Sequence, residues 1–181
     1  MSKHLGNLTV TAENVHSFPA VDEIYGHLTI TAGADLRAPR LGLVRGWVTV
    51  QMGARLTAPL LGLADGWATI DGHFSAPHLA EVRADMLVGD ASVIDLPALL
   101  SVGSLNLKRG ADKKLVSLTT VRDSLTLQAR ASLSAPLLER IGKSVTLREK
   151  ARLDAPVLNF IGGYADIDET ARIAAPRFIG G

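Results

Sequence analysis

The chain has 181 residues, of which 47% are hydrophobic and only 4% aromatic, so we expect one domain over residues 1–181 with an aliphatic core. Its 19 Lys and Arg residues nearly balance 18 Asp and Glu residues, which argues against a nucleic-acid-binding protein, since that class usually has a basic excess. The chain contains no cysteine, which excludes disulfides and thiolate metal sites.

No apolar segment of the sequence resembles a signal peptide or a membrane span. The N-terminus lacks the apolar stretch of a secretory signal, and no run approaches the roughly 18 apolar residues that cross a bilayer. We therefore expect a cytoplasmic protein without a membrane segment. A bacterial or phage origin, including a virion component, is compatible with the same features.

The chain from Gly6 onward is a series of nine similar units of 18 to 20 residues. All eight prolines fall at one position of the unit, and only the sixth unit lacks it, with Val116 in its place. A fixed short period of this kind is typical of a solenoid, in which each unit forms one coil. Coils 1 to 9 begin at Gly6, Gly26, Gly46, Gly66, Ala84, Gly103, Asp123, Lys143 and Gly163.

Each unit begins with alternating apolar and polar residues, such as Leu28 and Ile30, which predict a short strand with one buried face. The second part of the unit places further apolar residues at buried positions, such as Leu36 and Leu41. Proline fixes φ and removes an N–H group, so we expect it at a corner where no ladder hydrogen bond is needed. The glycine before each strand is expected to supply a positive φ in a tight turn.

These features predict an all-β fold, namely a right-handed parallel β-solenoid of about nine coils. Strands of successive coils would stack about 4.8 Å apart and give a rod of roughly 40 Å. The right-handed winding is expected from the twist of strands and the usual handedness of crossovers.

The segment LSAPLLERIGKSVTLREKARLDAPVLNFIGGYADI, residues 133–167, resembles the repeat of receptor L domains, which are single-stranded β-helices. The chain is also similar to leucine-rich-repeat-like proteins of unassigned role from bacteria and phages, although the asparagine position of the leucine-rich repeat is missing. The resemblance implies a binding scaffold. It carries over no catalytic residue.

No group of residues has the pattern of a catalytic centre. His73 and His78 lie in one shortened coil and form a possible zinc pair, but no third ligand is evident, and a surface turn is the alternative interpretation. The Gly142-Lys143-Ser144 triplet lacks the earlier glycine of a phosphate-binding loop. No nucleophile, base and orienting residue occur together, so we expect a protein that is not an enzyme and has no cofactor or metal.

Side chains that alternate with the buried strand residues form columns along the solenoid, because equivalent positions align from coil to coil. One column brings His27, Trp47 and Trp67 side by side, which predicts a protein-binding surface, a carbohydrate-binding surface or a shield over the sheet. The next column contains Thr29, Thr49 and Thr69, and a threonine ladder of this kind also occurs on ice-binding solenoids. Threonine is equally an ordinary residue on an exposed strand face. We therefore expect a protein partner, with carbohydrate binding, or less readily ice binding, as the alternative.

The last coil ends in an apolar sequence without a polar cap. Ile167, Phe178 and Ile179 occupy positions that other coils bury, and an exposed end layer favours self-association. The sequence thus predicts a homodimer through the C-terminal coil, because a two-fold contact closes whereas a head-to-tail contact continues to grow.

Overall fold

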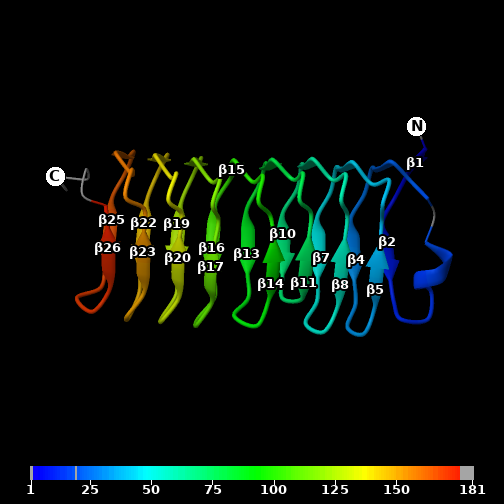
Figure 1. Cartoon of the computed structure of the whole chain (residues 1–181), viewed down its shortest axis with the longest axis horizontal. Helices are drawn as coiled ribbons and strands as arrows, with labels where there is room; N and C mark the ends of the chain where they lie inside the picture. Colours follow the sequence, from blue (N-terminus) through cyan, green and yellow to red (C-terminus); the bar gives the residue numbers. More distant parts are fainter. Residues whose placement is uncertain (1, 19, 176–181) are drawn as a thin grey trace.

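The computed structural model describes residues 2–18 and 20–175, and in it the chain forms a rod of stacked coils with its two ends far apart (Figure 1). In the described residues the strands of successive coils pair in parallel, and each pair joins equivalent positions, as Thr49 with Thr29 and Thr69. The model therefore confirms an all-β parallel solenoid of about nine coils. A single 3-10 helix, η1 (Val15–Ser17), stands in coil 1 where the later coils have a strand.

A full coil contributes three strands, two more than the one strand that the sequence clearly predicts, so the rod has three faces. Two sheets run the whole length of the rod. Sheet A consists of the two-residue strands β1 (Lys3–His4), β3 (Glu23–Ile24), β6 (Leu43–Val44), β9 (Leu63–Ala64), β12 (Glu81–Val82), β15 (Ser101–Val102), β18 (Thr120–Val121), β21 (Arg140–Ile141) and β24 (Phe160–Ile161). Sheet B, which is formed by the predicted strands, consists of β2 (Leu8–Val10), β4 (Leu28–Ile30), β7 (Val48–Val50), β10 (Ala68–Ile70), β13 (Met86–Val88), β16 (Leu105–Leu107), β19 (Leu125–Leu127), β22 (Val145–Leu147) and β25 (Ala165–Ile167).

The third face is divided between two sheets of four strands each. Sheet C consists of β5 (Asp35–Arg37), β8 (Arg55–Thr57), β11 (His73–Ser75) and β14 (Val93–Asp95), and sheet D of β17 (Asp112–Lys114), β20 (Ser132–Ser134), β23 (Arg152–Asp154) and β26 (Arg172–Ala174). In the described residues β14 and β17 do not pair, so the third face is interrupted between coils 5 and 6.

The core is a set of aliphatic columns that run along the inside of the rod. The predicted inward residues Leu28, Ile30, Leu36 and Leu41 are buried. Leu138 is fully buried in line with Leu118 and Leu158 of the neighbouring coils, as the repeat predicts. Burying one such side chain contributes about 1.5–3 kcal/mol, so a regular column of leucines is a large part of the stabilisation.

The prolines among the described residues occupy corners, as predicted. In coil 3 the amide of Leu61 donates to the carbonyl of Ala58 at 3.1 Å, which closes a β-turn with Pro59 at its second position. Proline suits this position because its fixed φ matches the turn and its missing N–H is not needed. In coil 6, where Val116 replaces proline, the equivalent bond from Leu118 to Leu115 is longer, at 3.4 Å.

The positive φ expected at the glycines before the strands is found at Gly6, with φ of 124°, but not at Gly26, Gly46 or Gly66. Other positive φ angles occur one corner later, at Gly33 and Gly53. Glycine is needed before the strand because successive coils approach closely there. A Cβ atom on Gly66 would lie 2.5 Å from the carbonyl oxygen of Gly46, a distance that real side chains do not adopt.

The interruption of the third face coincides with a lysine in a core column. Lys113 stands where other coils have Leu36, Leu56 or Leu133, and it is only 8% exposed. Its ammonium donates to the carbonyl of Ser92 at 2.5 Å and to that of Asp90 at 3.2 Å. Burial lowers the pKa of Lys113, against the opposing influence of Asp112 and Asp90. The ammonium thus satisfies carbonyl groups of coil 5 that have no β17 partner.

Candidate functional site

The model brings together the three aromatic residues that the sequence predicts as a binding surface. The rings of His27 and Trp47 are stacked with centroids 4.3 Å apart, and those of Trp47 and Trp67 with centroids 5.2 Å apart. Trp47 is 47% exposed and Trp67 is 52% exposed. We call these three residues the aromatic stack. Two adjacent tryptophans left half-exposed are unusual on a surface that has no partner.

The stack is held by the backbone as well as by ring contacts. The amide of Trp47 donates to Nδ1 of His27 at 3.0 Å, and the amide of His27 donates to Oδ1 of Asn7 at 2.9 Å. Because Nδ1 of His27 accepts this bond, its imidazole carries a proton on Nε2 only. Each side chain therefore fixes the start of the next coil, which keeps the rings in line.

Only one ring face of the tryptophan pair is uncovered. Trp47 lies between His27 and Trp67, so both of its faces are occupied. The planes of Trp47 and Trp67 differ by only 6°, so the free face of Trp67 is turned away from Trp47, toward coil 5. The tryptophan pair can therefore be extended on the coil 5 side.

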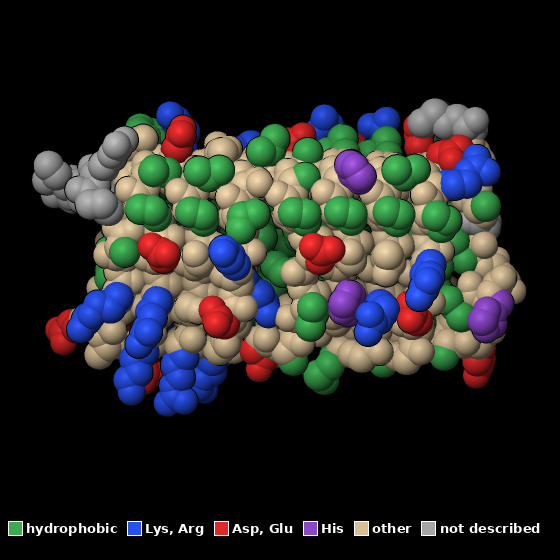
Figure 2. Space-filling view, viewed as in Figure 1, with side chains coloured by type: hydrophobic (Ala, Val, Ile, Leu, Met, Phe, Trp, Pro, Cys, Tyr) green, Lys and Arg blue, Asp and Glu red, His purple; other side chains and the backbone are tan. Residues whose placement is uncertain are grey.

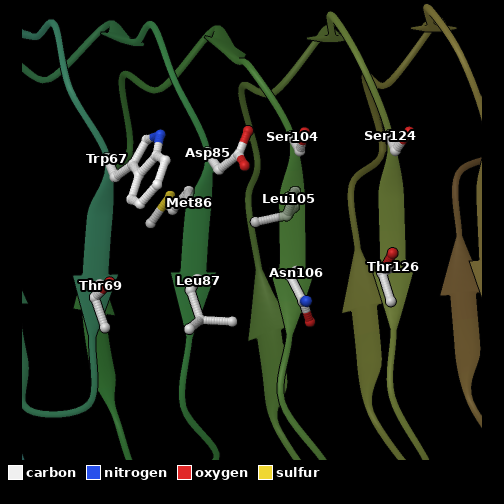
Figure 3. A pocket seen from close by; sticks show the side chains of 10 residues that line it. All are labelled: Trp67, Thr69, Asp85, Met86, Leu87, Ser104, Leu105, Asn106, Ser124 and Thr126. Carbon is white, nitrogen blue, oxygen red and sulfur yellow. The ribbon is translucent and has the colours of Figure 1, made fainter.

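A groove begins at this free face. The next residues of the same column are Asp85, Ser104 and Ser124, whose side chains are much shorter than indole, so the surface steps down after Trp67 (Figure 3). The resulting hollow has a volume of about 340 Å³ and crosses strands β10, β13, β16 and β19. It is lined by Trp67, Thr69, Asp85, Met86, Leu87, Ser104, Leu105, Asn106, Ser124 and Thr126.

The groove combines an apolar floor with polar edges. Met86 and Leu105 are buried beneath it, whereas Asp85 is exposed, and Leu87 and Asn106 are partly exposed. The amide of Gln128 donates to Oδ1 of Asn106 at 3.3 Å, which leaves the amide nitrogen of Asn106 available as a donor. The lining can therefore offer hydrogen-bond donors, acceptors and one negative charge.

The threonine column runs beside the stack. Thr29, Thr49 and Thr69 are paired in register and are partly exposed, and Thr69 also lines the groove. The column is interrupted at coils 5 and 6, where Leu87 and Asn106 replace threonine, and it resumes at Thr126. The structure therefore places the three threonines on strands of sheet B and the three aromatic residues immediately before strands β4, β7 and β10.

The other candidate residues do not form a site. Nδ1 of His78 lies 2.6 Å from the carbonyl oxygen of Pro59, to which it donates, and His73 lies on β11. Within residues 2–18 and 20–175, no group of three His, Asp or Glu side chains could hold a metal ion. No helix in the same ranges is long and apolar enough to cross a membrane.

The predicted dimer interface is described only in part. Ile167 on β25 is exposed, and β24, β25 and β26 are the last strands of their sheets in the described residues. Phe178 and Ile179 lie outside those residues.

Comparison of the chain with protein-family models, with curated proteins and with solved structures found no match. What the chain binds must therefore be inferred from the geometry of its own surface.

The groove is the feature that reasoning from the sequence missed. Asp85 was visible in the same column as the tryptophans, but the sequence does not show that a short residue after Trp67 leaves one indole face open. The usable signal was the abrupt change of side-chain size from Trp67 to Asp85 and then to Ser104.

Proposed function

We propose that this chain is a non-enzymatic scaffold that binds a protein partner through sheet B, around Trp47 and Trp67. The observation that carries the proposal is the pair of parallel, half-exposed indoles on neighbouring coils, whose backbones are joined to adjacent coils by hydrogen bonds. Large rigid aromatic side chains dominate the binding energy of protein interfaces, because they bury much area with little loss of conformational freedom. The resemblance to receptor L domains and leucine-rich-repeat-like proteins supports a binding role of the same kind.

Carbohydrate binding is the second candidate, and one observation favours it. The free face of Trp67 stands beside hydroxyl, amide and carboxylate groups of the groove, which is a suitable arrangement for a sugar ring. However, the rings of the stack cover one another, so the surface offers one open face and not a broad aromatic platform. The protein partner is therefore the preferred function.

The test is capture of partners from a lysate of the native host by the unchanged chain and by Trp47→Ala with Trp67→Ala. We expect the double variant to lose the partner that the unchanged chain captures, because hot-spot aromatics typically contribute about 2 kcal/mol or more each. Far-ultraviolet circular dichroism and the melting temperature should remain close to those of the unchanged chain, since both side chains are half-exposed.

Leu100→Ala with Leu137→Ala is the matched control, because both leucines are about half-exposed but lie outside the stack and the groove, at the proline corners. Retention of the partner by the tryptophan double variant would contradict the proposal. A large loss of stability in that variant would show that the tryptophans shield the fold.

A further inference from the structure

We propose that the groove beyond Trp67 binds an arginine side chain of the partner, with the guanidinium stacked on Trp67 and paired with Asp85. This inference rests on the proposed function and names the chemistry of the contact. It follows from three observations: an incomplete ring stack, an exposed carboxylate that makes no ion pair, and the same combination of groups elsewhere in the chain.

The aromatic stack has a vacant next position. His27, Trp47 and Trp67 are spaced by 4.3 and 5.2 Å, close to one coil per ring. A flat group placed on the free face of Trp67 would therefore lie at the level of coil 5. That coil has Asp85 in the same column, and its short side chain leaves the space above it open (Figure 3). The next member of the stack would thus lie directly against a carboxylate.

Asp85 has the charge that such a ligand requires. Its side chain is exposed and makes no ion pair or side-chain hydrogen bond within residues 2–18 and 20–175. Its charge helps to raise the pKa of Lys143, but the ammonium of Lys143 is paired with Asp123 and leaves the Asp85 carboxylate open to a second cation. Two carboxylates near the same corner are already paired: Asp65 with Arg45 and Arg83, and Asp123 with Lys143. The surrounding half of the rod is also acidic, with 6 Lys and Arg against 10 Asp and Glu over residues 1–100.

The same rod already uses this combination within its own surface. Cζ of Arg45 lies 5.5 Å from the ring centroid of Tyr25, and Nη1 of Arg45 lies 3.0 Å from Asp65. An aromatic ring, a guanidinium and a carboxylate thus come from three successive coils. In the groove the ring and the carboxylate are present, and the cation between them is the part that a partner would supply.

Guanidinium fits this position better than ammonium. It is planar, so it can stack on indole, and its edge donates two parallel hydrogen bonds to a carboxylate. Ammonium is a strongly hydrated point charge that gains less from stacking. The groove should therefore discriminate arginine from lysine, whereas a surface that acts by charge alone would not.

The test uses the whole chain labelled with ¹⁵N and three small probes: Nα-acetyl-arginine amide, Nα-acetyl-lysine amide and Nα-acetyl-citrulline amide. The chain has two tryptophans and so gives two indole N–H signals, which Trp67→Leu assigns. We expect the arginine probe to shift the Trp67 signal more than the Trp47 signal. The lysine probe lacks a planar cationic group, and the citrulline probe lacks the positive charge. Each should bind at least about fivefold more weakly than the arginine probe.

Asp85→Asn should weaken the arginine probe by about five- to tenfold, because it removes the charge while keeping the shape. Asp154→Asn, an exposed position on sheet D, is the control and should leave the affinity unchanged. As a second measurement on the unchanged chain, affinity should fall as salt is raised from about 50 to about 500 mM, since the contact is exposed to solvent.

Equal binding of arginine and lysine, equal binding of arginine and citrulline, or no effect of Asp85→Asn would overturn the inference. A shift of Trp67 by N-acetylglucosamine trisaccharide, with none by arginine, would overturn it in favour of a glycan. If the tryptophan double variant loses its partner and the arginine probe does not bind the groove of the unchanged chain, only this inference fails. If arginine binds the groove while that variant keeps its partner, the proposed function fails instead.

Discussion

Coils 1–5 and coils 6–9 are built from the same repeated phrase but differ in their third face. Sheets A and B pass through both halves, whereas the third face changes from sheet C to sheet D between β14 and β17. At that boundary the proline is replaced by Val116 and the core leucine by Lys113. The difference shows that two continuous sheets suffice to carry the register through a defect in the third.

The two halves also differ in charge. Residues 101–181 contain 13 Lys and Arg against 8 Asp and Glu, the reverse of the acidic first half. Figure 2 shows Lys and Arg side chains gathered toward the C-terminal end of one face. The near-neutral total charge is therefore the sum of an acidic first half and a basic second half. The aromatic stack and Asp85 belong to the acidic half.

The largest expected effect tests whether the halves unfold together. Leu61→Ala and Leu138→Ala remove fully buried side chains from one column in the first and second half, and each should cost about 2–5 kcal/mol of unfolding free energy. Because sheets A and B join the halves, each variant should shift a single urea transition. Two separate transitions, with only one displaced, would show that the interruption uncouples the halves.

A smaller effect is expected at the corner before sheet B. Gly66→Ala would place a Cβ atom 2.5 Å from the carbonyl of Gly46 and should lower stability by about 1–3 kcal/mol. The second half has Asp123 at the equivalent position, so that coil already holds a side chain there. Asp123→Ala is the control and should change stability by less than about 0.5 kcal/mol. Equal effects of the two variants in thermal melts would show that contact with the carbonyl of Gly46 is not the reason for glycine at position 66.

The smallest effect concerns the boundary itself. Lys113→Met leaves the carbonyls of Asp90 and Ser92 without the ammonium donor and should cost about 1 kcal/mol, whereas exposed Lys114→Met on the same strand should change little.

The pH dependence of that loss has a definite sign. Burial lowers the pKa of Lys113 below 10.5, so the unfolded chain binds the proton more tightly than the folded chain. The unchanged chain should therefore gain stability relative to Lys113→Met as pH rises from the folded pKa toward 10.5. A constant difference across that interval, measured by urea unfolding at several pH values, would contradict this assignment.

The period of the repeat made the strands of sheet B, the proline corners and the aromatic column predictable. Leu28 and Ile30 alternate with polar residues, and equivalent positions must align once coils stack in parallel. The strands of sheets A, C and D were not predicted as strands. Those of sheet A have only two residues, and those of sheets C and D have one inward position each, whereas most strands of sheet B have two inward apolar residues that alternate with an outward one. Lys113 could have been found by aligning coil 6 with the leucine column. Its contacts with the carbonyls of Asp90 and Ser92 could not, because they depend on the missing pairing of β14 with β17, which no residue pattern predicts.

The glycine column was interpreted wrongly because two different physical needs select the same residue. Gly53 is required for its backbone angle, with φ of 76°, and Gly66 for the space that a side chain would fill. A sequence cannot distinguish these needs. The groove was not predicted for a related reason. It exists because the short side chain of Asp85 does not fill the space beside Trp67, and a residue pattern does not show unfilled space.

The shortened coil 4 shows one place where this architecture accepts a change of length. Four residues separate β7 from β8 but only two separate β10 from β11, and yet the strands on either side remain in register. The corner between sheets B and C thus absorbs insertions and deletions while the sheets keep their pairing. For protein engineering this corner is a natural place to insert a foreign epitope or a tag, on a different edge of the rod from the tryptophans.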